Sequence, residues 1–589
     1  MIPIHASFFS LPNYCARSHC CDRLFFVERS GHRDAQTRRK LHGCYGQEVD
    51  QREGLEEEGQ EEVSEEGLEK EGLEKEKGFE KEEEVTFEKA LPPIDRLGPL
   101  RRIDESPLTR AFVLVIGLLL PVGCASAARG GGEARLSETL SRLLADPSLR
   151  HSGSALLVVS LDRGDTLYAR EIDRLYTPAS NLKLFTAASA LHVLGPDFRF
   201  ETTVAAGGPW ARDTLPGDVY LIGGGDPDLV TDDLAALADS VVAHGVRLVL
   251  GRVVPVADRF AGAEWGPGWM WDDGPYWYWP YTSALTLNDN SVTVRVTPGW
   301  EVGAPVSAIL DPPTDYVRLT VDARTGAAGG EPALEVDRHW TPKANAIDVR
   351  GTLPLDAEPV SEVRTVEDPA AYAARVFTEL LAERGVAVLD SRPGSASALS
   401  PDPIPIARHL SDSLAVSVRN FLKVSDNLTG EQLVKAIGAQ AAGPPGDYAN
   451  GLAAERRFLA AEVGIDTTSM VLADGSGVSR YNLVTARQVV GLLAYMAGRE
   501  DLAPAFFSAL PIAGVDGTLH DRLRGTAAER AARAKTGSLS GVSALSGYVV
   551  TAGGEQLAFS MLMEFFPGSA APRRAVQDSI VATLARLRR

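Results

Sequence analysis

Apolar residues follow regular periods only after residue 128. Residues 136–144 have the spacing of a helix, and residues 153–161 and 166–170 have that of two strands joined by a turn. A further helix begins within residues 177–185. These segments supply enough apolar positions to predict a folded body in this part of the chain.

Residues 200–400 change character. They are rich in Val, Thr, Gly and Pro, a composition typical of short strands separated by turns. The strand-like runs lie at 219–222, 248–254, 292–296, 317–321 and 346–349. One helix is predicted at 231–243. We expect a β-rich insertion, at 205–403, between two halves of one domain.

Helices return after residue 404, and strands follow near the end of the chain. The predicted helices are 413–424, 429–441, 448–463 and 485–497, and the predicted strands are 534–538, 544–551 and 556–563. The last two strands are joined at 552–554, as in a hairpin, and a final helix is predicted at 572–587. The expected fold is α+β and multidomain, with one domain formed by residues 128–204 and 404–589.

Charge is spread unevenly along the chain. The formal net charge is −20, yet residues 51–90 alone hold 17 Glu and 6 basic residues. Residues 1–107 offer few apolar side chains to bury, so this charged, low-complexity extension predicts disorder or an isolated helix. The sequence has no basic stripe, which argues against a nucleic-acid partner.

Residues 108–127 have the three parts of a secretory signal. Arginines, of which Arg110 is the last, precede the apolar run 111–122, and small residues follow it up to Ala127. The run is too short to span a bilayer, so the alternative is a buried helix. We expect export across the inner membrane to the periplasm. Because the signal starts about a hundred residues into the chain, we also expect the true start to lie downstream of Met1.

Cys124 offers a second interpretation of this segment. Gly123 before it fits a lipobox, although Pro121 stands where Leu is usual, and lipidation would give association with a membrane surface. All five cysteines lie at or before Cys124, so the main body has no disulfide framework and no thiolate metal site. The ten histidines form no His-x-x-x-His pair, which argues against a zinc peptidase. We expect no metal and no organic cofactor.

Three short motifs carry the candidate chemistry. Ser180 and Lys183 are three residues apart at a predicted helix start, so their side chains share a face. A serine hydroxyl needs an adjacent base to act as a nucleophile, and a desolvated lysine can be that base. Ser425-Asp426-Asn427 lies between two predicted helices, and Lys535-Thr536-Gly537 opens a predicted strand. One Ser-x-x-Lys match is expected by chance, whereas three ordered matches in suitable elements are not.

These motifs, in this order, resemble the signature of penicillin-binding proteins and class A β-lactamases. The gaps are 245 residues from Ser180 to Ser425 and 110 from Ser425 to Lys535. They are similar to those of the low-molecular-mass class C penicillin-binding proteins, the D-alanyl-D-alanine carboxypeptidase/endopeptidases of peptidase family S13. Further similar stretches are 220–227, 284–290, 474–482 and 534–539. The resemblance runs from about residue 134 to the end and implies a transpeptidase-like (serine β-lactamase-like) domain split by a large insertion.

The resemblance implies catalytic roles for the first two motifs. Ser180 would attack the carbonyl between two D-alanines of a peptidoglycan stem peptide, and Lys183 would take its proton. Ser425 would relay the proton to the leaving amine, and Asn427 would hydrogen-bond the substrate amide and Lys183. Water would then hydrolyse the acyl-enzyme. Because β-lactam antibiotics mimic the dipeptide, they would inhibit the enzyme by acylating Ser180.

The third motif and its neighbour would bind the substrate. By the same resemblance, Lys535 would bind the terminal carboxylate with the help of Thr536. The backbone N–H groups of Ser180 and Ser538 would form the oxyanion hole. Gly537 would let the strand approach the substrate closely.

Other interpretations remain open. A β-lactamase or esterase would use the same residues, although no residue can be assigned the glutamate that class A enzymes use for deacylation. A non-catalytic cell-wall-binding protein would not need the motif lysines. The Trp/Tyr-rich stretch 265–281 fits either surface packing or substrate binding. We expect Asp474–Gly477 to be a structural turn, and Asp226 and Asn290 to be structural as well.

Overall fold

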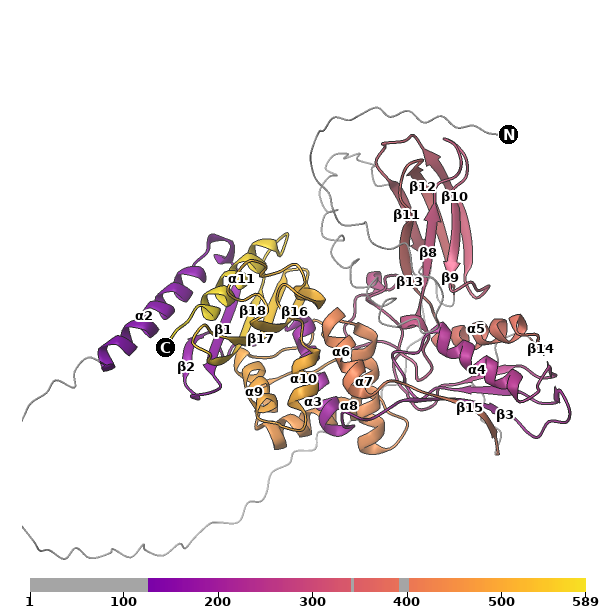
Figure 1. Ribbon diagram of the computed structural model, residues 1–589, viewed down its shortest axis with the longest axis horizontal. Coiled ribbons are helices and arrows are strands. Elements are labelled where there is room, and N and C mark those ends of the chain that lie inside the picture. The colour runs from indigo at the N-terminus through magenta and orange to yellow at the C-terminus, as the bar shows by residue number, and fades with distance from the viewer. Residues whose placement is uncertain (1–124, 340–343, 391–401) are drawn as a thin grey trace, which may run out of the picture. The chain divides into compact units, whose positions relative to one another are not determined.

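The computed structural model of the chain describes residues 125–339, 344–390 and 402–589 (Figure 1). The charged extension, most of the secretory signal and Cys124 lie outside these residues, so the expectations for them stay predictions. From Arg129 onward the described residues belong to one compact unit.

A five-stranded antiparallel sheet combines strands from both ends of the described chain. Its order is β16-β17-β18-β1-β2, so β1 pairs with β18 although about four hundred residues separate them. The strands are β1 (Gly153–Ser160), β2 (Thr166–Arg170), β16 (Ala532–Leu539), β17 (Val542–Val550) and β18 (Gln556–Glu564). β1 is buried on both faces, with Ala155 and Leu157 in one core and Leu156 and Val158 in another. This double burial explains its continuous apolar sequence.

Helices cover both faces of this sheet. α2 (Ala125–Leu143) and α11 (Ala571–Ala585) contribute to the core on the Leu156 face. The other face packs on a helical layer around the central helix α3 (Lys183–Val193), which is buried on all sides from Lys183 to Leu191. The other helices of this layer are α6 (Leu414–Val424), α7 (Asn427–Ala442), α8 (Tyr448–Phe458), α9 (Ala486–Ala497) and α10 (Ala503–Ala509). The sequence pattern does not predict α10, because the helix is too short to show a period.

The segment between α3 and α6 builds a separate core around a sheet of order β15-β3-β5-β7. Its strands are β3 (Glu201–Ala206), β5 (Val219–Ile222), β7 (Val253–Val256) and β15 (Ile404–Leu410), and its helices are α4 (Thr231–Ala243) and α5 (Pro369–Glu383). β3 and β15 pair antiparallel, with Glu201 opposite Leu410. The chain therefore leaves the helical layer and returns to it along adjacent strands.

Two elements of this segment differ from the sequence prediction. β15 is a strand where helices are expected to return, because pairing with β3 stabilises a run in which Pro405 disfavours a helix. The register shifts at Pro405, which is how a sheet accommodates a residue without an N–H. Helix α5 is also unpredicted, although Asp368 caps it and Pro369 occupies its first turn.

Three small sheets complete the inserted segment, with orders β10-β12-β11, β13-β8-β9 and β14-β6-β4. Their strands are β4 (Thr214–Leu215), β6 (Leu248–Val249), β8 (Ser291–Thr297), β9 (Ser307–Asp311), β10 (Arg318–Gly326), β11 (Ala333–Arg338), β12 (Ala346–Pro354), β13 (Val360–Thr365) and β14 (Ala387–Val388). The predicted strand 248–254 is two strands, β6 and β7. Gly251 separates them at a place where a Cβ would lie 2.6 Å from the Gly217 carbonyl oxygen.

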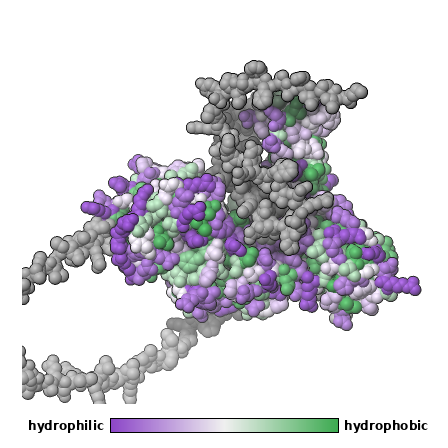
Figure 2. Space-filling model, in the orientation of Figure 1, coloured by the Kyte–Doolittle hydropathy of each residue, from purple (hydrophilic) through white to green (hydrophobic). Residues whose placement is uncertain are grey.

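The surface carries both polar and apolar side chains. Hydrophilic and hydrophobic residues are interspersed over the face drawn in Figure 2. Within the described parts of the chain, no helix combines the length and apolar character that crossing a bilayer requires.

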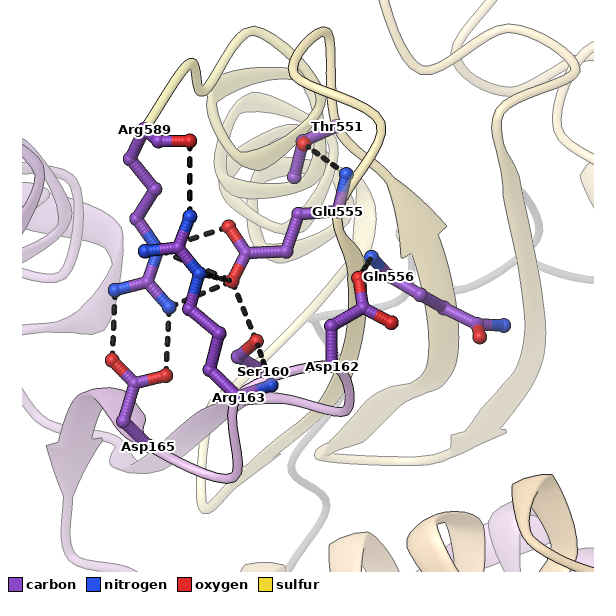
Figure 3. Close-up of polar contacts among 8 residues, drawn as sticks. All are labelled: Ser160, Asp162, Arg163, Asp165, Thr551, Glu555, Gln556 and Arg589. Carbon is purple, nitrogen blue, oxygen red and sulfur yellow. Dashed lines mark hydrogen bonds and ion pairs between the residues drawn. The ribbon is translucent and has the colours of Figure 1, made fainter.

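An ion network around Arg589 joins the C-terminal end of the chain to the β1–β2 and β17–β18 turns of the five-stranded sheet (Figure 3). The guanidinium donates to Glu555 over 2.7 Å and to Asp165 over 2.7–2.8 Å, and Glu555 also accepts a hydrogen bond from Ser160 Oγ. The side chains of Arg589 and Glu555 are each 6% exposed, so little water competes for the bonds between these two residues, whereas Asp165 is 46% exposed. The neighbouring guanidinium lowers the pKa of both Glu555 and Asp165.

Glu555→Gln tests this network. We expect it to lower the free energy of unfolding at pH 7 by about 2 kcal/mol, because it removes the charge from a buried hydrogen-bonded pair. A carboxyl with a lowered folded-state pKa stabilises above its unfolded pKa, and that contribution disappears as the pH falls. The difference between wild type and variant should therefore shrink below about pH 4.5.

Denaturant unfolding at pH 7 and pH 3 measures both effects. Glu331→Gln, at an exposed position, is the control and should change little. An equal loss of stability at both pH values would contradict the role of the Glu555 charge.

Candidate active site

Ser180 lies in a tight turn before the central helix, and not in the first turn of an α-helix as its sequence predicts. The turn, Ala179–Leu182, winds as a 3-10 helix, and α3 begins at Lys183. Side chains three residues apart are eclipsed in a 3-10 helix, which brings the Lys183 side chain to Ser180. Lys183 Nζ donates a hydrogen bond to Ser180 Oγ over 3.1 Å.

The Lys183 amine is fully buried and bound by two further acceptors. Nζ donates to Asn427 Oδ1 and to the backbone carbonyl oxygen of Ser476, each over 2.7 Å. Burial lowers the pKa of Lys183 to about 8. The charges of three nearby carboxylates oppose this shift; they belong to Asp426, Asp474 and Glu431.

Ser425 and Lys535 form a second contact. Ser425 follows the end of α6 at Val424, and its left-handed backbone, with φ of 65°, turns the chain toward α7. Lys535 Nζ, on β16, donates to Ser425 Oγ over 2.8 Å and to the Thr536 carbonyl oxygen over 3.0 Å. Burial holds the pKa of Lys535 well below its ordinary value, and the charge of Lys183 adds to this effect.

Strand β16 packs closely against the Ser180 turn. A Cβ on Gly537 would lie 2.8 Å from the Pro178 carbonyl oxygen and 3.2 Å from Ala179 Cβ. Glycine is required for this approach, because a side chain would push the strand away. Ser538 follows as an exposed residue of the strand. Within the described residues, no hydrogen bond joins the Ser538 side chain directly to Ser180.

Thr518 belongs to the site, although the sequence gives no signal for it. Thr536 Oγ1 donates to Thr518 Oγ1 over 2.8 Å. The preceding residues fix its loop: Lys423 Nζ donates to Asp516 over 2.7 Å, and a Cβ on Gly517 would lie 2.6 Å from the Lys423 carbonyl oxygen. Asp-Gly is a turn signal, so the loop can be predicted from the sequence. That Thr518 in this loop contacts Thr536 cannot be predicted from the sequence.

The loop Asp474–Gly477 is a turn, as its sequence predicts, but it also contributes to the site. Its Ser476 carbonyl oxygen is one of the acceptors that bind Lys183. Asp226 and Asn290 bond to backbone groups of the inserted segment: Asp226 accepts the Asp228 N–H, and Asn290 Nδ2 donates to a carbonyl oxygen of the aromatic stretch. These contacts fit structural roles for both residues.

The aromatic stretch 265–281 contacts the site directly. Asn427 Nδ2 donates to the Tyr278 carbonyl oxygen over 2.7 Å, and Trp269 Nε1 donates to Asp474 Oδ2 over 2.9 Å. Of the two interpretations of this stretch, packing is therefore observed for part of it, and the residues that it packs against belong to the candidate site.

Hydrogen bonds link the predicted site residues into two groups. Ser180, Lys183 and Asn427 form one group, and Ser425, Lys535 and Thr536 form the other. A buried amine in contact with a serine hydroxyl is the arrangement that nucleophilic catalysis requires. Across the part of the chain that the structure describes, no three His, Cys, Asp or Glu side chains are arranged to hold a metal ion.

Comparison with known proteins identifies the family. The model of the D-Ala-D-Ala carboxypeptidase 3 (S13) family matches residues 136–587. The chain belongs to the S13 family. A D-alanyl-D-alanine carboxypeptidase of Actinomadura sp. (strain R39) is 42% identical over 507 residues, which cover 83% of this chain and 93% of that protein. The D-alanyl-D-alanine carboxypeptidase DacB of Haemophilus influenzae is 29% identical, over 65% of this chain and 79% of that protein.

A solved structure supports the same assignment. The crystal structure of penicillin binding protein 4 from Haemophilus influenzae matches with a TM-score of 0.65 at 25% sequence identity, over 76% of this S13 chain and 99% of that one. The expected α+β, penicillin-binding fold is therefore confirmed. Membership of S13 makes the chain a serine peptidase, a hydrolase.

Gly537→Ala tests the close approach of β16 to the Ser180 turn in this S13 chain. The added methyl group would push the strand away from Pro178. We expect acylation of Ser180 by a fluorescent penicillin to slow about tenfold or more, because small displacements in a catalytic site have large effects on rate.

Gly553→Ala is the matched control. A Cβ there would lie 3.5 Å from its nearest neighbour, an ordinary contact, so the acylation rate should stay near that of the wild type. Circular dichroism checks that both variants are folded. An unchanged rate in folded Gly537→Ala would show that the close approach is not needed.

Proposed function

We propose that this chain is a serine-type D-Ala-D-Ala carboxypeptidase/endopeptidase that acts on peptidoglycan stem peptides and cross-links through an acyl-enzyme on Ser180. The observation that carries the proposal is the contact between Ser180 Oγ and the buried Lys183 amine, 3.1 Å apart. Membership of the S13 family supports it, as does the identity of 42% to the Actinomadura carboxypeptidase.

Lys183 acts as the general base. A neutral amine has two N–H bonds and one lone pair, and Asn427 Oδ1 and Ser476 O can each accept one N–H. The lone pair is then directed at Ser180 Oγ and takes the hydroxyl proton as the oxygen attacks the substrate carbonyl. With a pKa of about 8, about a tenth of the amine is neutral at pH 7.

Lys535 and Thr536 bind the terminal carboxylate of the substrate. Lys535 is buried and its pKa is low, so an incoming carboxylate supplies the opposite charge that favours its ammonium form. Ser425 accepts a hydrogen bond from the same amine and relays the proton from Lys183 to the leaving amine. The Thr518–Thr536 contact orients the threonine hydroxyl for the carboxylate.

The backbone N–H groups of Ser180 and Ser538 form the oxyanion hole. The packing of Gly537 against Pro178 supports this assignment, because it holds the strand that carries Ser538 beside the turn that carries Ser180. Fixed backbone donors need no rearrangement as charge develops on the oxygen. Loss of one such donor typically costs about 3 kcal/mol of barrier.

The proposal includes an inhibitor and a location. β-lactam antibiotics acylate Ser180; the Haemophilus relative is itself named a penicillin binding protein. The secretory signal at 108–127 supports export to the periplasm. A lipid anchor at Cys124 would place the enzyme at the membrane surface.

Labelling with a fluorescent penicillin tests the nucleophile. We expect a stable adduct on Ser180 of the purified full chain, located by mass mapping of peptides. Ser180→Ala and Lys183→Ala should abolish it, because the first removes the nucleophile and the second its base. Ser137→Ala, at an exposed serine of α2, should leave labelling unchanged.

Each failure has a distinct meaning. No adduct on a folded protein would favour the wall-binding interpretation, and rapid turnover of the penicillin would favour a β-lactamase. If the adduct forms, release of D-alanine from a stem peptide and cleavage of a cross-linked dimer measure the carboxypeptidase and endopeptidase activities separately.

The pH dependence of acylation tests the base. Only the neutral amine of Lys183 can accept the proton, so the second-order rate constant should rise as the pH increases and level off above about pH 8. The spontaneous hydrolysis of the penicillin, measured without enzyme at each pH, is the baseline. A rate constant that is flat from pH 6 to pH 9 would contradict a lysine base.

A further inference from the structure

We propose that Asp474 is a positioning residue for Lys183 that acts through the Ser476–Gly477 peptide, and that Trp269 of the inserted aromatic stretch completes its set of hydrogen-bond donors. The inference rests on the proposed function, since it concerns the base of that reaction. It assigns a role to a buried carboxylate outside the three motifs.

A single peptide group connects Asp474 to Lys183. The carbonyl oxygen of this peptide, on Ser476, accepts a hydrogen bond from Lys183 Nζ over 2.7 Å. The N–H of the same peptide, on Gly477, donates to Asp474 Oδ1 over 2.9 Å. A carboxylate bonded to the N–H polarises the carbonyl and fixes its direction. Asp474 therefore holds the Lys183 amine without touching it.

The contacts of Asp474 require it to be ionised. Oδ1 accepts hydrogen bonds from Gly477 N and Asn482 Nδ2, and Oδ2 accepts from Ser479 N and Trp269 Nε1, all within 2.6–2.9 Å. Four donors occupy the lone-pair positions of the two oxygens and leave no place for a proton. Burial raises the pKa of this carboxyl, and the four hydrogen bonds oppose that change.

Glu431 anchors the start of the same loop. Its fully buried carboxyl group accepts the N–H of Gly475 over 3.2 Å and that of Ser476 over 2.8 Å. Glu431 lies one turn after Asn427 on α7, so one face of this helix supplies a direct partner of Lys183 and an anchor for the loop. The position of the Ser476 carbonyl is thus fixed on both sides by carboxyl groups.

The inserted segment reaches the base through two hydrogen bonds. Trp269 donates to Asp474, and the Tyr278 carbonyl oxygen accepts the amide of Asn427. The Trp269 side chain is 8% exposed, so its indole N–H has little access to water and depends on Asp474. Asn427, which binds the Lys183 amine directly, and Asp474, which acts on it through a peptide, are therefore both bound by the aromatic stretch.

Several charged groups surround the Lys183 amine. They are Asp426, the N-cap of α7, Glu431 within α7, Asp474 in the loop before α9, and Lys535 on β16. Two further charged groups interact with these carboxylates: Glu455 of α8 and Lys435 of α7. From α6, the Phe421 ring lies 5.9 Å from Nζ. Because nearby negative charge favours the ammonium form, removal of the Asp474 charge lowers the pKa of Lys183.

Asp474→Asn tests the proposal through the pH profile of penicillin acylation. We expect the maximal second-order rate constant to fall about tenfold, because an amide cannot accept four hydrogen bonds and the loop shifts. We also expect the midpoint of the profile to move down by about 0.5–1 pH unit, because neutral Lys183 forms at lower pH. A merely structural role would reduce the yield of folded protein and leave the midpoint where it is.

A pair of tryptophan variants keeps the test decisive if Asp474→Asn fails to fold. Trp269→Phe keeps an aromatic ring in the cluster but removes the indole N–H and part of the ring volume, so Asp474 loses one hydrogen-bond donor and is protonated more readily. Its midpoint should move in the same direction by a smaller amount. Trp265→Phe makes the same change on a neighbouring ring that is 40% exposed, and its profile should match the wild type.

The outcomes separate the two proposals. If the folded wild-type protein is not acylated, the proposed function fails. If the wild type is acylated and neither Asp474→Asn nor Trp269→Phe moves the midpoint, only the positioning role fails. If Asp474→Asn does not fold, an unmoved midpoint in Trp269→Phe is sufficient to overturn the positioning role.

Discussion

A lysine amine kept away from water is the constraint on which the rest of the site depends. Moving an ammonium group into a protein interior costs several kcal/mol, so the group must find partners or lose its proton. Lys183 does both. Its pKa falls to about 8, and its three hydrogen-bond partners come from the turn before α3, from α7 and from the Asp474–Gly477 loop. The environment that lowers the pKa of this amine therefore exists only when separate elements have come together around it.

The split sheet explains how those elements come together. The Ser180 turn follows β1 and β2, whereas the second and third motifs lie more than two hundred residues later. Pairing of β1 with β18 fixes the two halves of the domain in one sheet, and this sheet also contains β16, which packs against the Ser180 turn. The sheet that brings the parts of the site together is thus stabilised by burial of its apolar strands on both faces.

The sequence predicts the motif residues because their chemistry and order are visible along the chain, and it predicts elements such as α4 because their periods are regular. It does not predict the 3-10 winding at Ser180, since the choice between two tight helices depends on packing around Ala179 and Gly477. Thr518 and Trp269 are missed for a different reason. Each acquires its role from a single partner far away in sequence, and no local pattern marks such a pair.

The pairing of β3 with β15 has a consequence for how this architecture changes over evolution. The two ends of the inserted segment lie on paired strands and are as close as the ends of a hairpin. For the domain formed by residues 128–204 and 404–589, the segment therefore spans no greater distance than a short connection would. Because the entropy of closing a loop grows only slowly with its length, additions or deletions far from these strands cost the domain little. The aromatic stretch is the exception. Its hydrogen bonds to Asn427 and Asp474 join it to the site, so a change in this stretch, unlike one in the outer sheets, would need a matching change in α7 or in the Asp474–Gly477 loop.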